Sequence, residues 1–167
     1  CLTLLTLLVS AMLAHAAPAV ALFYGSNAPY DALKAFDIVV LDPDHHPTPN
    51  ALRKPYSEPY AYVAVGEAHP TRPYFKDIPD AARLAVNKDW GSLVIDLSHP
   101  GWADFLATNI VTPLWDKGYR GFFLDTLDSY RLAAKFDEAA QQDGLVAVIE
   151  TLHRRFPGIR LILNRGF

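Results

Sequence analysis

Residues 121–130 read Gly-Phe-Phe-Leu-Asp-Thr-Leu-Asp-Ser-Tyr. The apolar run over 121–124 is too short for a helix, and such runs are typical of parallel strands that are covered on both faces. The run ends directly in the carboxylate of Asp125, and a second carboxylate, Asp128, precedes a stretch of helical character. The segment therefore predicts a strand, a polar turn and a helix in that order, which is one βα unit.

The same pattern recurs along the chain. Short apolar runs predict six strands, over residues 20–23, 38–41, 60–65, 93–95, 121–124 and 161–163. Between them, apolar spacing predicts helices over residues 79–86, 102–115 and 129–156, the last in two pieces broken at Asp143-Gly144. Residues 43–59 carry five prolines and no helical period, which predicts an irregular loop over the sheet.

Six units of this kind predict an α/β fold. Two architectures compete, an open doubly wound sheet and a (β/α)8 TIM barrel, which needs eight strands and about 250 residues. A glycine-rich phosphate loop after the first strand would favour the open sheet. The residues there read Tyr24-Gly-Ser-Asn27 and match neither nucleotide-binding fingerprint. We therefore expect a TIM barrel, truncated here after about six strands.

Composition narrows the class of protein. The chain has 167 residues, of which 51% are hydrophobic and 20% charged, and its net charge is −3. These values indicate one folded domain, and the absence of a basic run argues against a nucleic-acid partner. The single cysteine, Cys1, allows neither an intrachain disulfide nor a cysteine-based zinc site.

The two ends of the chain carry separate signals. The apolar run from Leu2 to Leu13 is too short to cross a membrane, and Ala14-His-Ala16 fits a signal-peptide cleavage site. We read residues 1–16 as the remnant of a secretory signal and expect a periplasmic or secreted protein without stable membrane insertion. Residues 17–167 form the N-terminal part of a barrel domain in this interpretation, because the chain ends just after an apolar strand at Leu163.

Polar residues end every predicted strand. In a parallel sheet these positions share one edge, and in a barrel they meet at the mouth where active sites lie. A single strand-end aspartate is more often a helix N-cap. A series of them favours a site, which we predict to contain Tyr24, Asp42, Glu67, Asp96, Asp125, Asn164 and Arg165.

Crowded carboxylates repel one another, so something must offset their charge. A metal ion, an oxocarbenium-like transition state and a cationic substrate all fit. The metal hypothesis would make Asp42, Glu67 and Asp96 ligands of a metal-dependent barrel enzyme. The glycosidase hypothesis needs one carboxylate as nucleophile or base and another as acid. A barrel that binds carbohydrate without catalysis is a further alternative, and no organic cofactor is indicated.

Four segments together resemble glycoside hydrolase family 114, and in particular its members that cleave Pel-type exopolysaccharide. They are Phe23-Tyr-Gly25, Tyr62-Val-Ala-Val-Gly-Glu67, residues 121–130 and Leu163-Asn-Arg-Gly-Phe167. The resemblance implies a TIM barrel in the periplasm that cleaves an α-1,4-linked galactosamine/N-acetylgalactosamine polymer of biofilms, internally and with retention of configuration. The partner would be a cationic amino-sugar polysaccharide, with other exopolysaccharide export proteins as further candidate partners.

The resemblance also assigns roles. Asp125 matches the family's nucleophile, and the general acid/base would be a glutamate beyond residue 167. In the glycosidase hypothesis, and apart from the resemblance, Asp42, Glu67, Asp96 and Asp128 would position the sugar and stabilise positive charge. Tyr24, Tyr130, Asn164 and Arg165 complete the predicted substrate-binding set, and no metal is assigned.

Overall fold

The computed structural model describes residues 17–52, 55 and 57–165. The predicted signal remnant, residues 1–16, lies outside these described residues. None of the helices in the described part is both long and apolar enough to cross a membrane.

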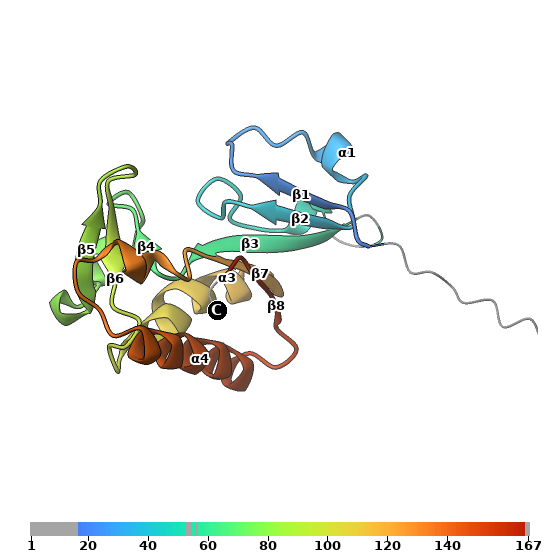
Figure 1. Cartoon of the computed structure of the whole chain (residues 1–167). Helices are drawn as coiled ribbons and strands as arrows, with labels where there is room; N and C mark the ends of the chain where they lie inside the picture. The colour runs from blue at the N-terminus through green and yellow to red at the C-terminus, as the bar shows by residue number, and fades with distance from the viewer. Residues whose placement is uncertain (1–16, 53–54, 56, 166–167) are drawn as a thin grey trace, which may run out of the picture.

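A parallel sheet of five strands forms the main layer of the fold (Figure 1). Its strands, in spatial order, are β1 (Val20–Phe23), β2 (Ile38–Leu41), β3 (Glu58–Ala64), β7 (Gly121–Asp125) and β8 (Arg160–Leu163). Each strand pairs in parallel with the next of these strands along the chain. A doubly wound sheet reverses its strand order at a switch point, whereas a barrel winds in one direction. The observed order therefore confirms the α/β class and matches an arc of a barrel.

One of the six predicted barrel strands was wrong. Residues 93–95 belong to β6 (Ser92–Ile95), which pairs antiparallel with β4 (Glu67–Ala68) and β5 (Arg83–Asn87) in a separate small sheet. Figure 1 shows this sheet beside the main one. Every residue of β6 is buried because the strand is central, so its continuous apolar run reports burial and not strand direction.

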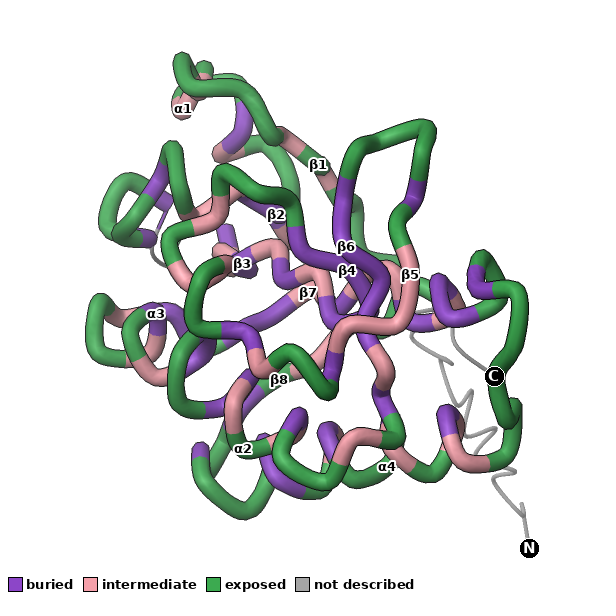
Figure 2. The backbone as a smooth tube through the Cα atoms, turned by 90° about the vertical axis from the view of Figure 1, so that its left-hand side faces the viewer, coloured by how far each residue is buried: buried purple, intermediate pink, exposed green. Residues whose placement is uncertain are grey.

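Helices cover one face of the main sheet. A helical segment runs through α2 (Trp102–Phe105), a π-helical turn (Leu106–Val111) and α3 (Thr112–Asp116), which confirms the helix expected over 102–115. It packs beside the long helix α4 (Glu138–Arg155). Together with inward residues of the sheet, such as Val63, Phe122 and Leu124, these helices enclose the larger core. Along α4, buried residues alternate with exposed ones (Figure 2), and the buried ones include Leu145, Val148 and Leu152.

Two helix predictions need correction. Residues 79–86 form a 3₁₀ turn (Asp80–Ala82) followed by β5, because pairing with β6 outweighs the local helical spacing. Residues 129–156 contain a 3₁₀ turn (Ser129–Leu132) and then α4, which runs through Gly144 without a break. At Gly144 a Cβ would lie 2.0 Å from the carbonyl oxygen of Leu97, so the glycine permits close packing and does not end the helix.

The remaining elements are short. α1 (Tyr30–Leu33) and a 3₁₀ turn (Asn50–Leu52) pack with β1 and β2 around a smaller apolar cluster that includes Leu33, Val39 and Leu52. A further 3₁₀ turn (Phe75–Asp77) lies in the loop between β4 and β5. The described part of residues 43–59 is irregular apart from the turn at 50–52 and the start of β3.

Candidate active site

Asp125 is the last residue of β7, and its carboxylate is held on both oxygens. The Tyr62 hydroxyl donates to Oδ2 over 2.9 Å, and the Asn164 amide donates to Oδ1 over 2.7 Å. Tyr62 comes from β3 and Asn164 directly follows β8, so the two strands that flank β7 each supply one donor. Two donors from rigid strands fix the orientation of this carboxylate.

The backbone just after Asp125 is strained. Thr126 has a φ of 61°, a left-handed conformation that is rare for a β-branched residue. Its hydroxyl accepts a hydrogen bond from the Gly66 amide at 3.1 Å, and a Cβ at Gly66 would meet the Thr126 carbonyl oxygen at 2.1 Å. Strain of this kind concentrates at functional sites, because the surrounding structure must hold it in place.

Two tyrosines form a wall beside Asp125. The ring of Tyr24 packs edge-on against that of Tyr62, with centroids 5.0 Å apart. Burial, followed by the nearby charge of Asp125, raises the pKa of Tyr62 well above its usual value. Burial and then Asp125 and Asp42 also raise the pKa of Tyr24. Both hydroxyls therefore stay protonated at neutral pH, and Tyr62 can serve as a permanent donor to Asp125.

Asp42, directly after β2, is paired with Arg72. The guanidinium donates to both carboxylate oxygens at 2.8 and 3.1 Å, and it also contacts Asp44 at 2.7 Å. Burial alone would raise the pKa of Asp42, but the hydrogen bonds from Arg72 and from the Asp44 backbone outweigh it and hold that pKa below its usual range. Asp42 thus lines the site as a member of an ion-pair cluster with Arg72 and Asp44.

Glu67, at the start of β4, is almost fully buried although it lines the same pocket. Its carboxylate accepts hydrogen bonds from the Ser129 hydroxyl at 2.6 Å, from the Asn87 amide at 3.2 and 3.3 Å, and from the Ser92 hydroxyl. Through these hydrogen bonds, Glu67 connects β5, β6 and the segment that follows β7 beside the pocket.

The pocket has a volume of about 540 Å³. It brings together four of the predicted residues, Tyr24, Asp42, Glu67 and Asp125, and adds Tyr62, His69, Arg72, Trp90 and Thr126 among others. Three carboxylates face one guanidinium in this lining, a formal charge of −2. Asn164 is exposed and reaches the site through its hydrogen bond to Asp125.

The structure places the other four predicted residues outside this lining. Asp96 is bound by Ser98 and by the Gln141 amide at 2.6 Å, which joins the end of β6 to α4. These bonds outweigh burial and lower the pKa of Asp96. Tyr130 is buried against Phe136, and Asp128 immediately precedes the 3₁₀ turn at Ser129. Arg165 is exposed and has a φ of 68°.

The metal hypothesis required Asp42, Glu67 and Asp96 to converge. Asp96 instead lies with Gln141 outside the pocket, and Asp42 is bound to Arg72. Within the described residues, no three histidine, cysteine or acidic side chains are grouped closely enough to hold a metal ion. The proposed ligand set is therefore not assembled in this fold.

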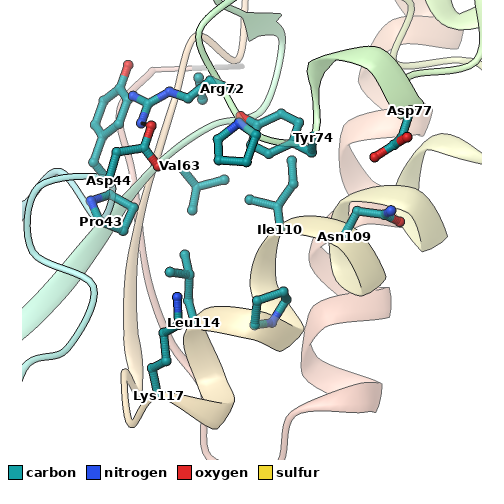
Figure 3. Close-up of a pocket in the computed structure, with 14 residues that line it drawn as sticks. Pro43, Asp44, Val63, Arg72, Tyr74, Asp77, Asn109, Ile110, Leu114 and Lys117 are labelled. Atoms are coloured by element: carbon teal, nitrogen blue, oxygen red, sulfur yellow. Dashed lines mark hydrogen bonds and ion pairs between the residues drawn. The ribbon is translucent and has the colours of Figure 1, made fainter.

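A second cavity, of about 300 Å³, shares Tyr62, Ala64 and Arg72 with this pocket. Figure 3 shows Arg72 and Asp44 at one side of it, above the apolar side chains of Ile110 and Leu114. Tyr74 also lines this cavity, and burial raises the pKa of Tyr74 to about 12. Tyr62, Ala64 and Arg72 thus border both this cavity and the pocket of Asp125.

Sequence reasoning missed Arg72 and Thr126 as parts of the site. Arg72 lies in an irregular loop, where no periodicity points to a partner 30 residues away. Thr126 could have been noticed as the residue next to the strand-end aspartate, but its strain is visible only in the backbone. Trp90 also lines the pocket, and its position depends on the β5–β6 hairpin of the small sheet, whose antiparallel pairing the apolar runs did not predict.

Comparisons with known proteins show which family this chain resembles. The sequence model of glycoside hydrolase family GH114 matches residues 11–167. The glycoside hydrolase domain of PelA from Pseudomonas aeruginosa is 37% identical, with a TM-score of 0.76 over 90% of this chain and 61% of that one. A structure of Ega3 from Aspergillus fumigatus in complex with galactosamine is 16% identical and has a TM-score of 0.63 over 86% of this chain and 57% of that one.

More distant similarity shows the fold alone. A GH36 α-galactosidase, AgaA from Geobacillus stearothermophilus, is 16% identical, with a TM-score of 0.58 over 88% of this chain and 27% of that one. A search of curated proteins gives no match. The chain spans 61% of the solved PelA domain. The family match extends over almost the whole chain, and the likeness to PelA exceeds what shared fold alone produces: this chain belongs to glycoside hydrolase family GH114.

Proposed function

We propose that the protein is an endo-acting, retaining glycoside hydrolase that cleaves an α-1,4-linked galactosamine/N-acetylgalactosamine exopolysaccharide, with Asp125 as its nucleophile. The observation that carries this proposal is the carboxylate of Asp125, held on both oxygens by Tyr62 and Asn164 at the edge of an open acidic pocket. Family membership supports hydrolysis of a glycosidic bond. The galactosamine bound to Ega3 and the likeness to the PelA domain support the substrate class.

In this mechanism an Asp125 oxygen attacks the anomeric carbon while the bond to the leaving sugar oxygen breaks. A general acid delivers a proton to that oxygen. The same group, now a base, takes a proton from water, and the water oxygen displaces Asp125 from the glycosyl-enzyme. The two inversions give net retention, and Asp125 returns as a carboxylate.

We place the general acid/base on a glutamate beyond residue 167. A retaining enzyme needs its two carboxyl groups about 5–5.5 Å apart. Glu67 is a poor candidate because Asn87, Ser92 and Ser129 already donate to its oxygens. The acidic lining of the pocket suits a substrate with free ammonium groups, since opposite charges attract the polymer to the site.

The cellular setting is part of the proposal. The apolar run over residues 2–13 and the small residues after it favour export, and we place the mature protein in the periplasm or outside the cell. There it would meet the exopolysaccharide and the proteins that export it. Sequencing the N-terminus of the exported protein tests this, and a mature chain that keeps residues 1–16 would contradict it.

The first test is release of reducing ends from a partly deacetylated α-1,4-galactosamine polymer by the full-length protein, with EDTA present. Asp125→Asn should lower turnover by about 10³-fold or more, because the amide cannot act as a nucleophile. Asp116→Asn is the matched control, since Asp116 is an exposed carboxylate at the end of α3. Its turnover should equal that of the wild type.

The stereochemistry tests the mechanism separately. Proton NMR should show the α anomer as the first product, and an initial β anomer would rule out retention. Cleavage that persists in Asp125→Asn would exclude this nucleophile. Binding of the polymer by the folded wild type without any product would support a carbohydrate-binding protein instead. Loss of activity in EDTA would contradict the mechanism proposed here, which uses no metal ion.

A further inference from the structure

Trp90 is a large apolar side chain that the fold leaves uncovered beside Asp125. The residue is 76% exposed, yet it lines the same pocket as Asp125 and Tyr24. It lies in the turn between β5 and β6, and Figure 2 shows this turn as an exposed tip next to the buried strand β6. Single exposed apolar side chains are common on protein surfaces, but this indole lines the pocket of Asp125, where its ring face is open to a ligand.

The turn that carries Trp90 has a defined shape. The Gly91 amide donates to the Asn87 carbonyl at 2.8 Å, and the Asp89 amide donates to the Asn87 side chain at 3.1 Å. Gly91 has a φ of 66°, which a residue with a side chain adopts only with strain. Trp90 is therefore presented by an ordered turn.

The carboxylate of Glu67 is hydrogen-bonded to both strands of this hairpin. Asn87 and Ser92 stand on either side of the turn, both are buried, and both donate to the Glu67 carboxylate. Ser129, four residues after Asp125, donates to the same carboxylate at 2.6 Å. Glu67 thus connects the segment after β7 to the hairpin, which fixes Trp90 relative to Asp125.

We propose that Trp90 is a sugar-binding platform that stacks on the apolar face of a hexosamine ring next to the bond being cleaved, and that Glu67 is the residue that positions it. This inference rests on the proposed function. A galacto-configured ring exposes the C–H groups of C3, C4 and C5 on one face, which matches the flat face of an indole. Such a contact suits a rigid, presented aromatic ring, because little conformational entropy is lost on binding.

Polymer binding tests the platform without relying on turnover. In the Asp125→Asn background of the full-length protein, Trp90→Ala should weaken binding of α-1,4-galactosamine oligomers about tenfold. Trp90→Phe, which keeps an aromatic face, should recover most of this loss. Val86→Ala is the matched control, because Val86 is exposed on β5 of the same hairpin and lies outside the pocket lining. Its affinity should not change.

The contact can also be observed directly. Bound oligomer should shift the emission of Trp90 to shorter wavelength, and the shift should be absent in Trp90→Ala. Stacking on the ring face predicts the same loss with N-acetylated and with deacetylated oligomers. A loss confined to the deacetylated oligomer would overturn ring stacking, since it would mean that the indole contacts the ammonium group. Unchanged affinity in Trp90→Ala would overturn the platform itself.

A double-mutant cycle tests the role of Glu67. If Glu67 acts through Trp90, Glu67→Ala should raise KM with little change in kcat, and it should add little to Trp90→Ala. Glu67→Gln, which keeps acceptor capacity for Asn87 and Ser92, should restore much of the affinity. Full additivity of the two losses would show that Glu67 binds sugar independently.

These outcomes are separable from those of the proposed function. If the wild type neither cleaves nor binds the polymer, the function is wrong. If it cleaves the polymer and Trp90→Ala keeps the wild-type KM, the function stands and the platform fails.

Discussion

Asp125 shows how one side chain acquires a role from its neighbours. It is the final residue of β7, where the sheet ends and the pocket begins. Its oxygens each accept one hydrogen bond from an adjoining strand or its end, so the carboxylate cannot rotate freely. A nucleophile benefits from this, because attack on the anomeric carbon requires one orientation, and fixing it beforehand removes part of the entropic barrier.

Removing the Tyr62 hydroxyl tests this positioning. We expect Tyr62→Phe to lower kcat about tenfold with little change in KM, because Asp125 loses one of its two donors while the pocket keeps its shape. Reducing-end release at varied polymer concentration separates the two constants. Tyr60→Phe is the control, since Tyr60 is a buried tyrosine of the same strand. An equal fall in kcat for both variants would mean that the strand, and not the hydrogen bond, is responsible.

The sequence predicted the residues of this site unevenly. Asp42 and Asp125 were found because a carboxylate directly after an apolar run has a fixed place at the end of a parallel strand. Asp96 followed a run of the same kind, but its strand belongs to the small antiparallel sheet, and its carboxylate binds Gln141. Arg72 could not be found, because its bonds to Asp42 and Asp44 depend on how an irregular loop folds back.

At the scale of elements, the apolar patterns predicted where strands lie along the chain better than they predicted which strands pair with one another. The runs of β1, β2, β3, β7 and β8 were correctly placed in a parallel sheet. The run of β6 was assigned to the same sheet, because burial on both faces looks alike in a central antiparallel strand. The small sheet carries Glu67, which the strand-end pattern did predict, and the hairpin of Trp90 and Ser92, whose place in the pocket lining the wrong pairing concealed.

Gly144 in α4 gives a test at this scale. A glycine-to-alanine change inside a helix ordinarily stabilises it by about 0.5–1 kcal/mol. Here the new Cβ would lie 2.0 Å from the Leu97 carbonyl oxygen, so the helix or the loop after β6 must move. We expect Gly144→Ala to lower the free energy of unfolding by roughly 1–3 kcal/mol.

Chemical denaturation measures the effect, with Asp143→Ala as the control. Asp143 precedes Gly144 in α4 and is exposed, so its replacement should be neutral or slightly stabilising. A stabilised Gly144→Ala variant would show that α4 does not pack this closely on the loop after β6.

At the scale of the whole molecule, the winding of the sheet and the distribution of charge act together. Because the five parallel strands follow one another in chain order, their carboxyl ends meet on one rim. Asp42 and Asp125 lie on that rim, β4 adds Glu67, and among the described residues that line the pocket these three carboxylates face one guanidinium, that of Arg72. The whole chain also carries a net charge of −3, so no net positive charge elsewhere in the molecule offsets the negative charge of the pocket.

A negatively charged pocket should attract a cationic polymer over a long range, and dissolved salt screens this attraction. The Debye length falls from about 10 Å at 0.1 M salt to about 3 Å at 1 M. For a deacetylated galactosamine polymer we expect KM to rise about threefold or more between these concentrations, with a smaller change in kcat, because screening weakens the encounter and not the bond-breaking step. The fully acetylated polymer lacks the ammonium groups and should show a nearly constant KM. If both polymers respond equally to salt, the acidic lining does not select for charge, and the recognition must come from uncharged contacts such as the face of Trp90.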